Sequence, residues 1–154
     1  MTLKLYTSRY QSQALIQKSG LTPVSTSVGS PRFHLQYTLL DHLAEITPPR
    51  EIIHYGLERY RPLYLAKLEK IGVAKIIKAM EAIVDRSKKD GLVLLCYEDI
   101  AKEFCHRRLF AEWIEEKAGI VIPELTLAHL SPAPPKPKSP AVVQVGLFDA
   151  VGEA

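Results

Sequence analysis

Apolar residues follow two different spacings along this chain, and each spacing predicts one kind of element. Unbroken or alternating apolar runs predict short β-strands at 3–7, 21–27 and 92–96. Apolar positions that recur three and four residues apart predict helices at 11–19, 52–71, 73–89 and 105–118. Strands that alternate with helices are typical of an α/β fold, so we predict a single domain whose mostly parallel sheet is flanked by helices.

The run Leu92-Val93-Leu94-Leu95-Cys96 is apolar at every position, as in a strand that is covered on both faces. We therefore expect 92–96 to be the central strand. The stretch around 39–46 predicts only a short helix, and 120–122 predicts an edge strand before Pro123. Glycines at 20, 72 and 119 are expected to end helices.

Composition adds few constraints. The chain has 154 residues, of which 47% are hydrophobic, and a formal net charge of +3, which is enough for one packed core but too small a charge to indicate a nucleic-acid partner. No apolar run reaches the roughly 20 residues that span a bilayer, and the first residues do not resemble a signal peptide. We expect a cytoplasmic protein whose 2 cysteines stay reduced.

The C-terminal residues differ in character from the rest. Residues 131–140 are rich in proline and lysine and predict an extended spacer. They precede Gln144-Val145-Gly146-Leu147-Phe148-Asp149, an apolar peptide that a soluble chain rarely leaves uncovered. We predict an α/β domain at 1–126, a linker at 127–143 and a partner-binding peptide at 144–154.

This peptide resembles the sliding-clamp-binding motif of bacterial DNA polymerases and repair proteins, which pairs a glutamine with a leucine and a phenylalanine. The resemblance implies that Gln144 hydrogen-bonds at the edge of a groove while Leu147 and Phe148 fill an apolar pocket. Val145 and Gly146 depart from the preferred motif, which implies modest affinity. The alternative is that the peptide folds back on its own domain.

Polar and charged residues follow each predicted parallel strand, where open sheets bind ligands. Hydroxyl and guanidinium groups at these ends predict an anionic ligand, such as a phosphorylated compound or a nucleotide. The candidate ligand-binding residues are Thr7, Ser8, Arg9, Ser27, Arg32 and Arg107. The alternative for each arginine is a solvated surface charge.

Three further residues are candidates for catalysis. Cys105 stands at a predicted helix N-terminus beside basic residues, which favours a nucleophilic thiolate, although a cysteine there also serves as packing. His106 could act as a general acid or base, or could have a structural role as a cap or ion-pair partner. Glu98 could act as a general base, or could be an exposed loop carboxylate. Cys96 is interpreted as core. The cysteines and His106 lack the paired spacing of zinc motifs, so we expect neither a metal nor a cofactor.

These motifs together carry a family resemblance. Leu94-Leu95-Cys96-Tyr97-Glu98, followed by Cys105-His106-Arg107-Arg108, resembles the signature of the bacterial family named domain of unknown function 488. Tyr6-Thr7-Ser8-Arg9-Tyr10 is similar to its first strand-end motif, whereas Ser25-Thr26-Ser27 stands where many members have Asp-Val-Arg. The resemblance covers about residues 1–125 and implies an α/β sheet with a shared crevice, but no reaction.

Three hypotheses about function follow. The first is an accessory protein of bacterial or phage DNA replication or repair, which has an anion-binding crevice and is tethered to the sliding clamp by its C-terminal peptide. The second is an independent enzyme that acts on a nucleotide or another phosphorylated small molecule through Cys105. The third is a non-catalytic adaptor.

Overall fold

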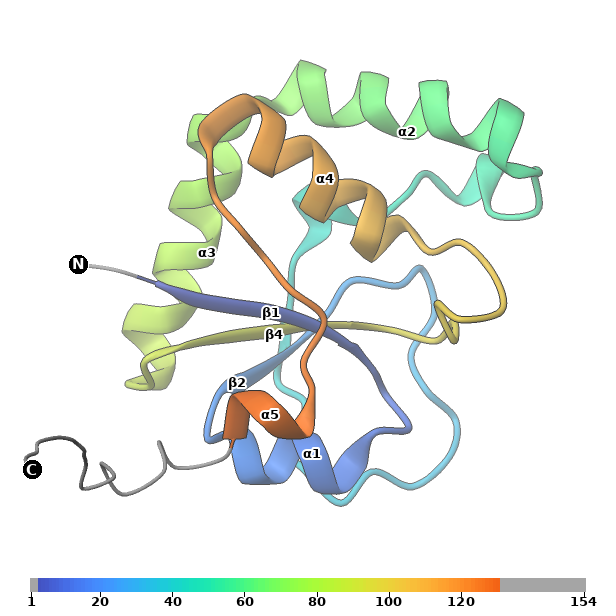
Figure 1. Cartoon of the computed structure of the whole chain (residues 1–154). Helices are drawn as coiled ribbons and strands as arrows, with labels where there is room; N and C mark the ends of the chain where they lie inside the picture. Colours follow the sequence, from blue (N-terminus) through green and yellow to red (C-terminus); the bar gives the residue numbers. More distant parts are fainter. Residues whose placement is uncertain (1–2, 131–154) are drawn as a thin grey trace, which may run out of the picture.

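The computed structural model describes residues 3–130, and they form an α/β fold around one parallel sheet (Figure 1). Four strands, β1 (Lys4–Arg9), β2 (Thr22–Ser25), β3 (Asp41–His42) and β4 (Gly91–Cys96), lie in the order β1-β4-β2-β3, and all neighbours are parallel. The predicted fold class is therefore confirmed. β4 lies between β1 and β2, as predicted for the central strand.

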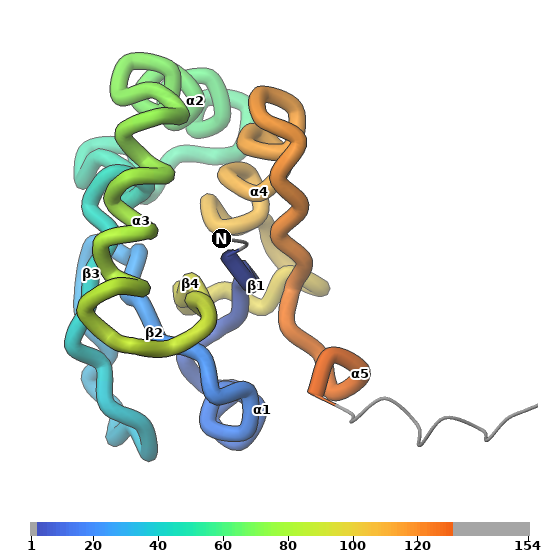
Figure 2. Tube along the Cα trace, turned by 90° about the vertical axis from the view of Figure 1, so that its left-hand side faces the viewer, coloured from blue at the N-terminus to red at the C-terminus, as the bar shows by residue number. Residues whose placement is uncertain are grey.

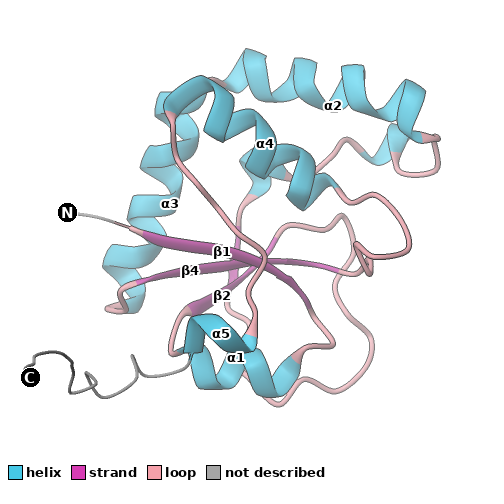
Figure 3. Ribbon diagram, in the orientation of Figure 1, coloured by secondary structure: helices cyan, strands magenta, loops and turns pink. Residues whose placement is uncertain are grey.

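Helices cover both faces of the sheet. Two 3-10 helices accompany the α-helices, and the helical elements are α1 (Gln13–Ser19), η1 (Ala44–Ile46), η2 (Arg50–Ile52), α2 (Leu57–Ile71), α3 (Val73–Ser87), α4 (His106–Ala118) and α5 (Leu127–Leu130). α2, α3 and α4 lie on one side of the sheet, and α1 and α5 lie on the other (Figures 2 and 3). α1 and α4 end at Gly20 and Gly119, which both adopt the left-handed conformation with φ of 69°.

β4 joins the two hydrophobic cores on either side of the sheet. Leu92 and Leu94 belong to the larger core under α2, α3 and α4, whereas Val93 and Leu95 belong to the smaller core against α1. This division follows from the strand geometry, because successive side chains point to opposite faces. It explains why β4 is apolar at every position.

Two predicted elements are wrong. The helix predicted at 39–46 is replaced by β3 and η1, because β3 pairs with β2 and the Leu43 N–H donates to the Ser25 carbonyl. The edge strand predicted at 120–122 does not form, and the Ile122 carbonyl instead accepts a hydrogen bond from Arg108 Nη1. In both places a tertiary contact outweighs the local pattern.

α5 lies inside the segment predicted to be a linker. The ring of His129 on this helix packs against the ring of Tyr6, with centroids 4.9 Å apart. The packed part of the chain thus extends to at least residue 130. Residues 131–154, which carry the rest of the predicted linker and the clamp-like peptide, lie outside the described residues.

Within residues 3–130, none of the helices is both long enough and apolar enough to cross a bilayer.

Candidate active site

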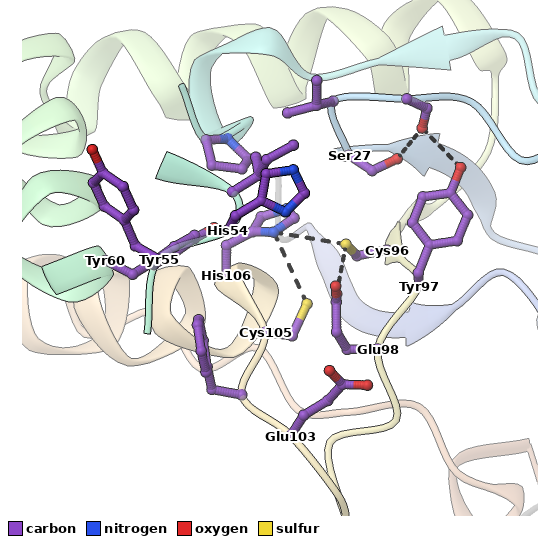
Figure 4. A pocket seen from close by; sticks show the side chains of 15 residues that line it. Ser27, His54, Tyr55, Tyr60, Cys96, Tyr97, Glu98, Glu103, Cys105 and His106 are labelled. Carbon is purple, nitrogen blue, oxygen red and sulfur yellow. Dashed lines mark hydrogen bonds between the residues drawn. The ribbon is translucent and has the colours of Figure 1, made fainter. Parts of the chain in front are cut away.

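A cavity of about 460 Å³ opens where β2 and β4 end (Figure 4). Its walls come from the segments that follow these strands, from the start of α4 and from the segment around the start of α2. The lining residues include Ser27, His54, Tyr55, Tyr60, Cys96, Tyr97, Glu98, Glu103, Phe104, Cys105 and His106. The cavity lies beyond the carboxyl ends of parallel strands, which is the usual ligand position in open α/β sheets.

Cys105 is the N-cap residue of α4 and is buried. Its sulfur accepts hydrogen bonds from the backbone N–H of Arg107 at 3.5 Å and from Arg107 Nη1 at 3.2 Å. A helix N-terminus and a guanidinium both favour the thiolate over the thiol. These contacts therefore stabilise a negative charge on the Cys105 sulfur.

The pKa of the Cys105 thiol reflects these contacts. Burial alone raises this pKa, but hydrogen bonds from Cys96 and His106, together with the charges of His106 and Arg107, outweigh burial and lower the pKa to about 6. An ordinary cysteine has a pKa of about 8.5. The surroundings of Cys105 thus favour the thiolate near neutral pH.

Arg107 is held rigidly beside this sulfur. Its side chain is fully buried and makes two hydrogen bonds to the Glu124 carboxylate, from Nε at 3.1 Å and from Nη2 at 2.8 Å. Glu124 also accepts a hydrogen bond of 2.6 Å from the Thr7 hydroxyl. This bidentate geometry leaves Nη1 pointing at Cys105.

His106 presents one particular ring nitrogen to the cysteines. Its Nε2 lies 3.0 Å from the Thr26 carbonyl oxygen, which can only accept, so Nε2 carries a hydrogen. The Thr26 hydroxyl, which donates to the Leu95 carbonyl, accepts from the same Nε2 at 2.9 Å. Nδ1 therefore faces the sulfurs, at 3.7 Å from Cys96 and 4.0 Å from Cys105.

Cys96 and Glu98 form the other half of the site. The Cys96 thiol donates a hydrogen bond of 3.0 Å to the Glu98 carboxylate. Hydrogen bonding to Cys105, burial and the negative charges of Cys105 and Glu98 all raise the pKa of Cys96. Burial raises the pKa of Glu98, but hydrogen bonding, chiefly from the Cys96 thiol, outweighs it and lowers that pKa below its ordinary value. Cys96 is therefore a protonated thiol beside a carboxylate.

The two sulfurs and a nitrogen of His106 all lie within 4.8 Å of one another. The sequence spacing of these residues does not match a zinc motif, yet the fold brings them close enough to share a metal ion. Three such groups are one short of the four ligands of a structural zinc site.

The structure brings together all three predicted catalytic residues, because Cys105, His106 and Glu98 line the same cavity. It also changes the interpretation of Cys96. This residue is buried, as predicted for the core, but its sulfur lies at the cavity wall beside Glu98. Its position as the last residue of β4 is the sequence signal for this placement.

The predicted ligand-binding residues do not gather into one site. Only Ser27 lines the cavity. Thr7 and Arg107 are committed to Glu124, Ser8 is buried in β1, Arg9 lies 3.7 Å from the Asp99 carboxylate, and Arg32 is exposed.

The charges at this cavity do not suit an anion. Among the described residues, its lining contains the carboxylates of Glu98 and Glu103 but neither a lysine nor an arginine. A phosphate would need a cation or several free N–H groups there. The cavity therefore gives the predicted anionic ligand no support.

Searches against family models, curated proteins and solved structures found no significant match to this chain. The resemblance to domain of unknown function 488 stays a prediction that depends on the motif residues. The structure itself defines a class: a single α/β domain with a cavity that contains two cysteines, a histidine and a glutamate.

Proposed function

We propose that this protein is an enzyme whose nucleophile is the Cys105 thiolate and whose substrate is a small electrophile in the cavity. The observation that carries the proposal is the pair of N–H groups of Arg107 aimed at the Cys105 sulfur at the start of α4. Such stabilisation of a thiolate at the wall of a cavity is the usual arrangement of a nucleophilic cysteine.

His106 supports this chemistry through Nδ1. In the neutral ring, Nδ1 is an acceptor that can take the proton of a thiol, and in the charged ring it is a donor to the thiolate. When the Cys105 sulfur bonds to the electrophile, the leaving group departs with the bonding electrons, and His106 can supply its proton. Nδ1, the ring nitrogen that faces the sulfurs, thus serves both as the proton acceptor and as the proton donor.

The charges of the cavity favour a neutral or cationic substrate. Glu98 and Glu103 line the cavity, and an anionic ligand would meet their negative charge. His54, Tyr55 and Tyr60 add polar and aromatic surface that suits an organic molecule. This proposal therefore replaces the phosphorylated substrate expected from the sequence.

Alkylation with iodoacetamide tests the nucleophile directly. In Cys96→Ser, Cys105 is the single cysteine of the chain, and the serine hydroxyl can still donate a hydrogen bond. We expect its alkylation rate to have a midpoint near pH 6 and to level off above pH 7. At pH 6 it should exceed the rate of an ordinary peptide thiol by about tenfold, after allowing for the weaker intrinsic nucleophilicity of a low-pKa thiolate.

The matched control is Cys105→Ser, in which Cys96 is the single cysteine and should react far more slowly. A rate for Cys105 that keeps rising to pH 9, as for an ordinary thiol, would contradict the proposal. So would one equivalent of zinc that stays with the protein after dialysis, because the sulfurs would then be ligands rather than nucleophiles.

A second proposal concerns where the enzyme acts. The sequence Gln144-Val145-Gly146-Leu147-Phe148-Asp149 and the proline-rich residues before it support a tether to a bacterial sliding clamp. A tether raises the effective concentration near replicating or repaired DNA without direct affinity for DNA. This would make the protein a cytoplasmic accessory factor of replication or repair.

A clamp pull-down with the full chain tests the tether. The Leu147→Ala and Phe148→Ala double variant should lose most of the clamp that the wild type recovers, because the two side chains are the proposed anchors. The Val142→Ala and Val143→Ala double variant removes neighbouring apolar groups outside the motif and should bind like the wild type. Equal recovery with all three proteins would end the clamp proposal and leave the thiolate proposal intact.

A further inference from the structure

We propose that Cys96 and Cys105 act as a dithiol pair, so that the protein reduces small neutral or cationic disulfides and itself acquires a Cys96–Cys105 disulfide. This inference rests on the proposed nucleophile, Cys105, and adds both a substrate class and a function for Cys96. The two sulfurs lie within 4.8 Å of each other at the carboxyl end of β4 and the start of α4.

The two cysteines have opposite surroundings, as two successive steps of thiol–disulfide exchange require. Cys105 accepts hydrogen bonds from two N–H groups of Arg107, so it is the attacking thiolate. Cys96 donates to Glu98, so it keeps its proton until the second step. Two cysteines that served only as core packing would not each need a charged partner.

Glu98 is placed to accept the proton that Cys96 must lose. Its carboxylate lies 3.0 Å from the Cys96 sulfur, and both residues line the cavity. A carboxylate in this position is a general base for a thiol that attacks its neighbour. The sequence hypothesis of an acid or base at Glu98 thus acquires a specific partner.

The reaction balances in two steps. The Cys105 thiolate attacks one sulfur of the substrate disulfide, a Cys105–substrate disulfide forms, and the first substrate thiolate leaves with the bonding electrons and takes a proton from His106 Nδ1, which is recharged from water. Cys96 then gives its proton to Glu98 and attacks Cys105, and the second substrate half leaves and takes up that proton. The substrate gains two electrons, and a dithiol reductant must reduce the protein for another cycle.

The charges of the cavity set the preference among disulfides. Glu98 and Glu103 should attract a cationic disulfide and repel an anionic one. Cystamine, which is cationic, is therefore expected to react about tenfold faster than the anionic 3,3′-dithiodipropionate at low ionic strength. The neutral 2-hydroxyethyl disulfide should lie between them.

Mass spectrometry of the reduced full-length protein, mixed with cystamine in the presence of a chelator, tests the pair. The wild type should become lighter by two hydrogen atoms and release both halves of the cystamine as free thiol. Cys96→Ser should instead keep one half of the cystamine on Cys105. Glu98→Gln should form the same adduct but resolve it roughly 100-fold more slowly, because the base is gone.

The outcomes separate this inference from the proposed nucleophile. If the wild type accumulates the same adduct as Cys96→Ser, Cys96 does not resolve it, and the dithiol inference fails while Cys105 remains a nucleophile. If neither protein reacts with cystamine and Cys105 also alkylates as an ordinary thiol, both proposals fail. Faster reaction with 3,3′-dithiodipropionate than with cystamine would overturn the substrate class alone.

Discussion

Replacing Glu124 with glutamine is expected to lower the free energy of unfolding by about 3–5 kcal/mol. Glutamine has nearly the same shape as glutamate, but it removes the negative charge that Arg107 meets through two hydrogen bonds. The Arg107 side chain is fully buried, so its charge would lose its bidentate carboxylate partner and keep only the contact with the Cys105 sulfur. Urea unfolding followed by circular dichroism measures the loss.

Glu116→Gln is the matched control, because Glu116 is exposed on α4. It should change the free energy of unfolding by no more than about 0.5 kcal/mol. The double variant Arg107→Met with Glu124→Leu should lose less than Glu124→Gln alone, since it removes both charges and refills the space with apolar groups. A Glu124→Gln protein as stable as the control would show that this ion pair contributes little.

The fold could be predicted largely from local patterns, because each core element carries a clear period. β4 is apolar at every position and forms the centre of the sheet, and α3 repeats its apolar residues every three or four positions. The failures share a cause. Asp41 and His42 have no strand pattern of their own and become β3 only because Val24 and Ser25 of β2 pair with them.

The site residues also differ in whether local sequence context was enough to select them. Cys105, His106 and Glu98 could be selected from the sequence because their position at a strand end and a helix start has a direct chemical meaning. Glu124 could not, since nothing in the sequence links it to Arg107, 17 residues earlier. This missing carboxylate explains why Arg107 seemed free to bind an anion.

The pairing of Arg107 with Glu124 also limits what the Arg107 guanidinium can bind. A guanidinium committed to a buried carboxylate cannot hold a substrate phosphate, but it can orient one remaining N–H toward a sulfur. Arg107 therefore donates to the Cys105 sulfur rather than to an anionic ligand. The functional centre that we propose is therefore the pair of cysteines and not the arginines.

The stability of the reduced protein should rise with pH because of Cys105. Its pKa is about 6 in the folded protein and about 8.5 in the unfolded chain, so between these values the unfolded chain binds more protons. The thiolate thus stabilises the fold fully above pH 8.5, and this contribution is lost as the pH falls through 6. Between pH 6 and pH 8 it should amount to about 2 kcal/mol.

Urea unfolding of the wild type and of Cys105→Ser, with reductant and chelator at each pH, isolates this contribution. Serine can still cap α4, so the helix start is preserved. The difference in the free energy of unfolding between the two proteins should grow from pH 6 to pH 8, whereas groups that titrate in this range away from Cys105 cancel. Parallel profiles for the two proteins would mean that Cys105 is protonated at neutral pH, and the proposed nucleophile would then lack its thiolate.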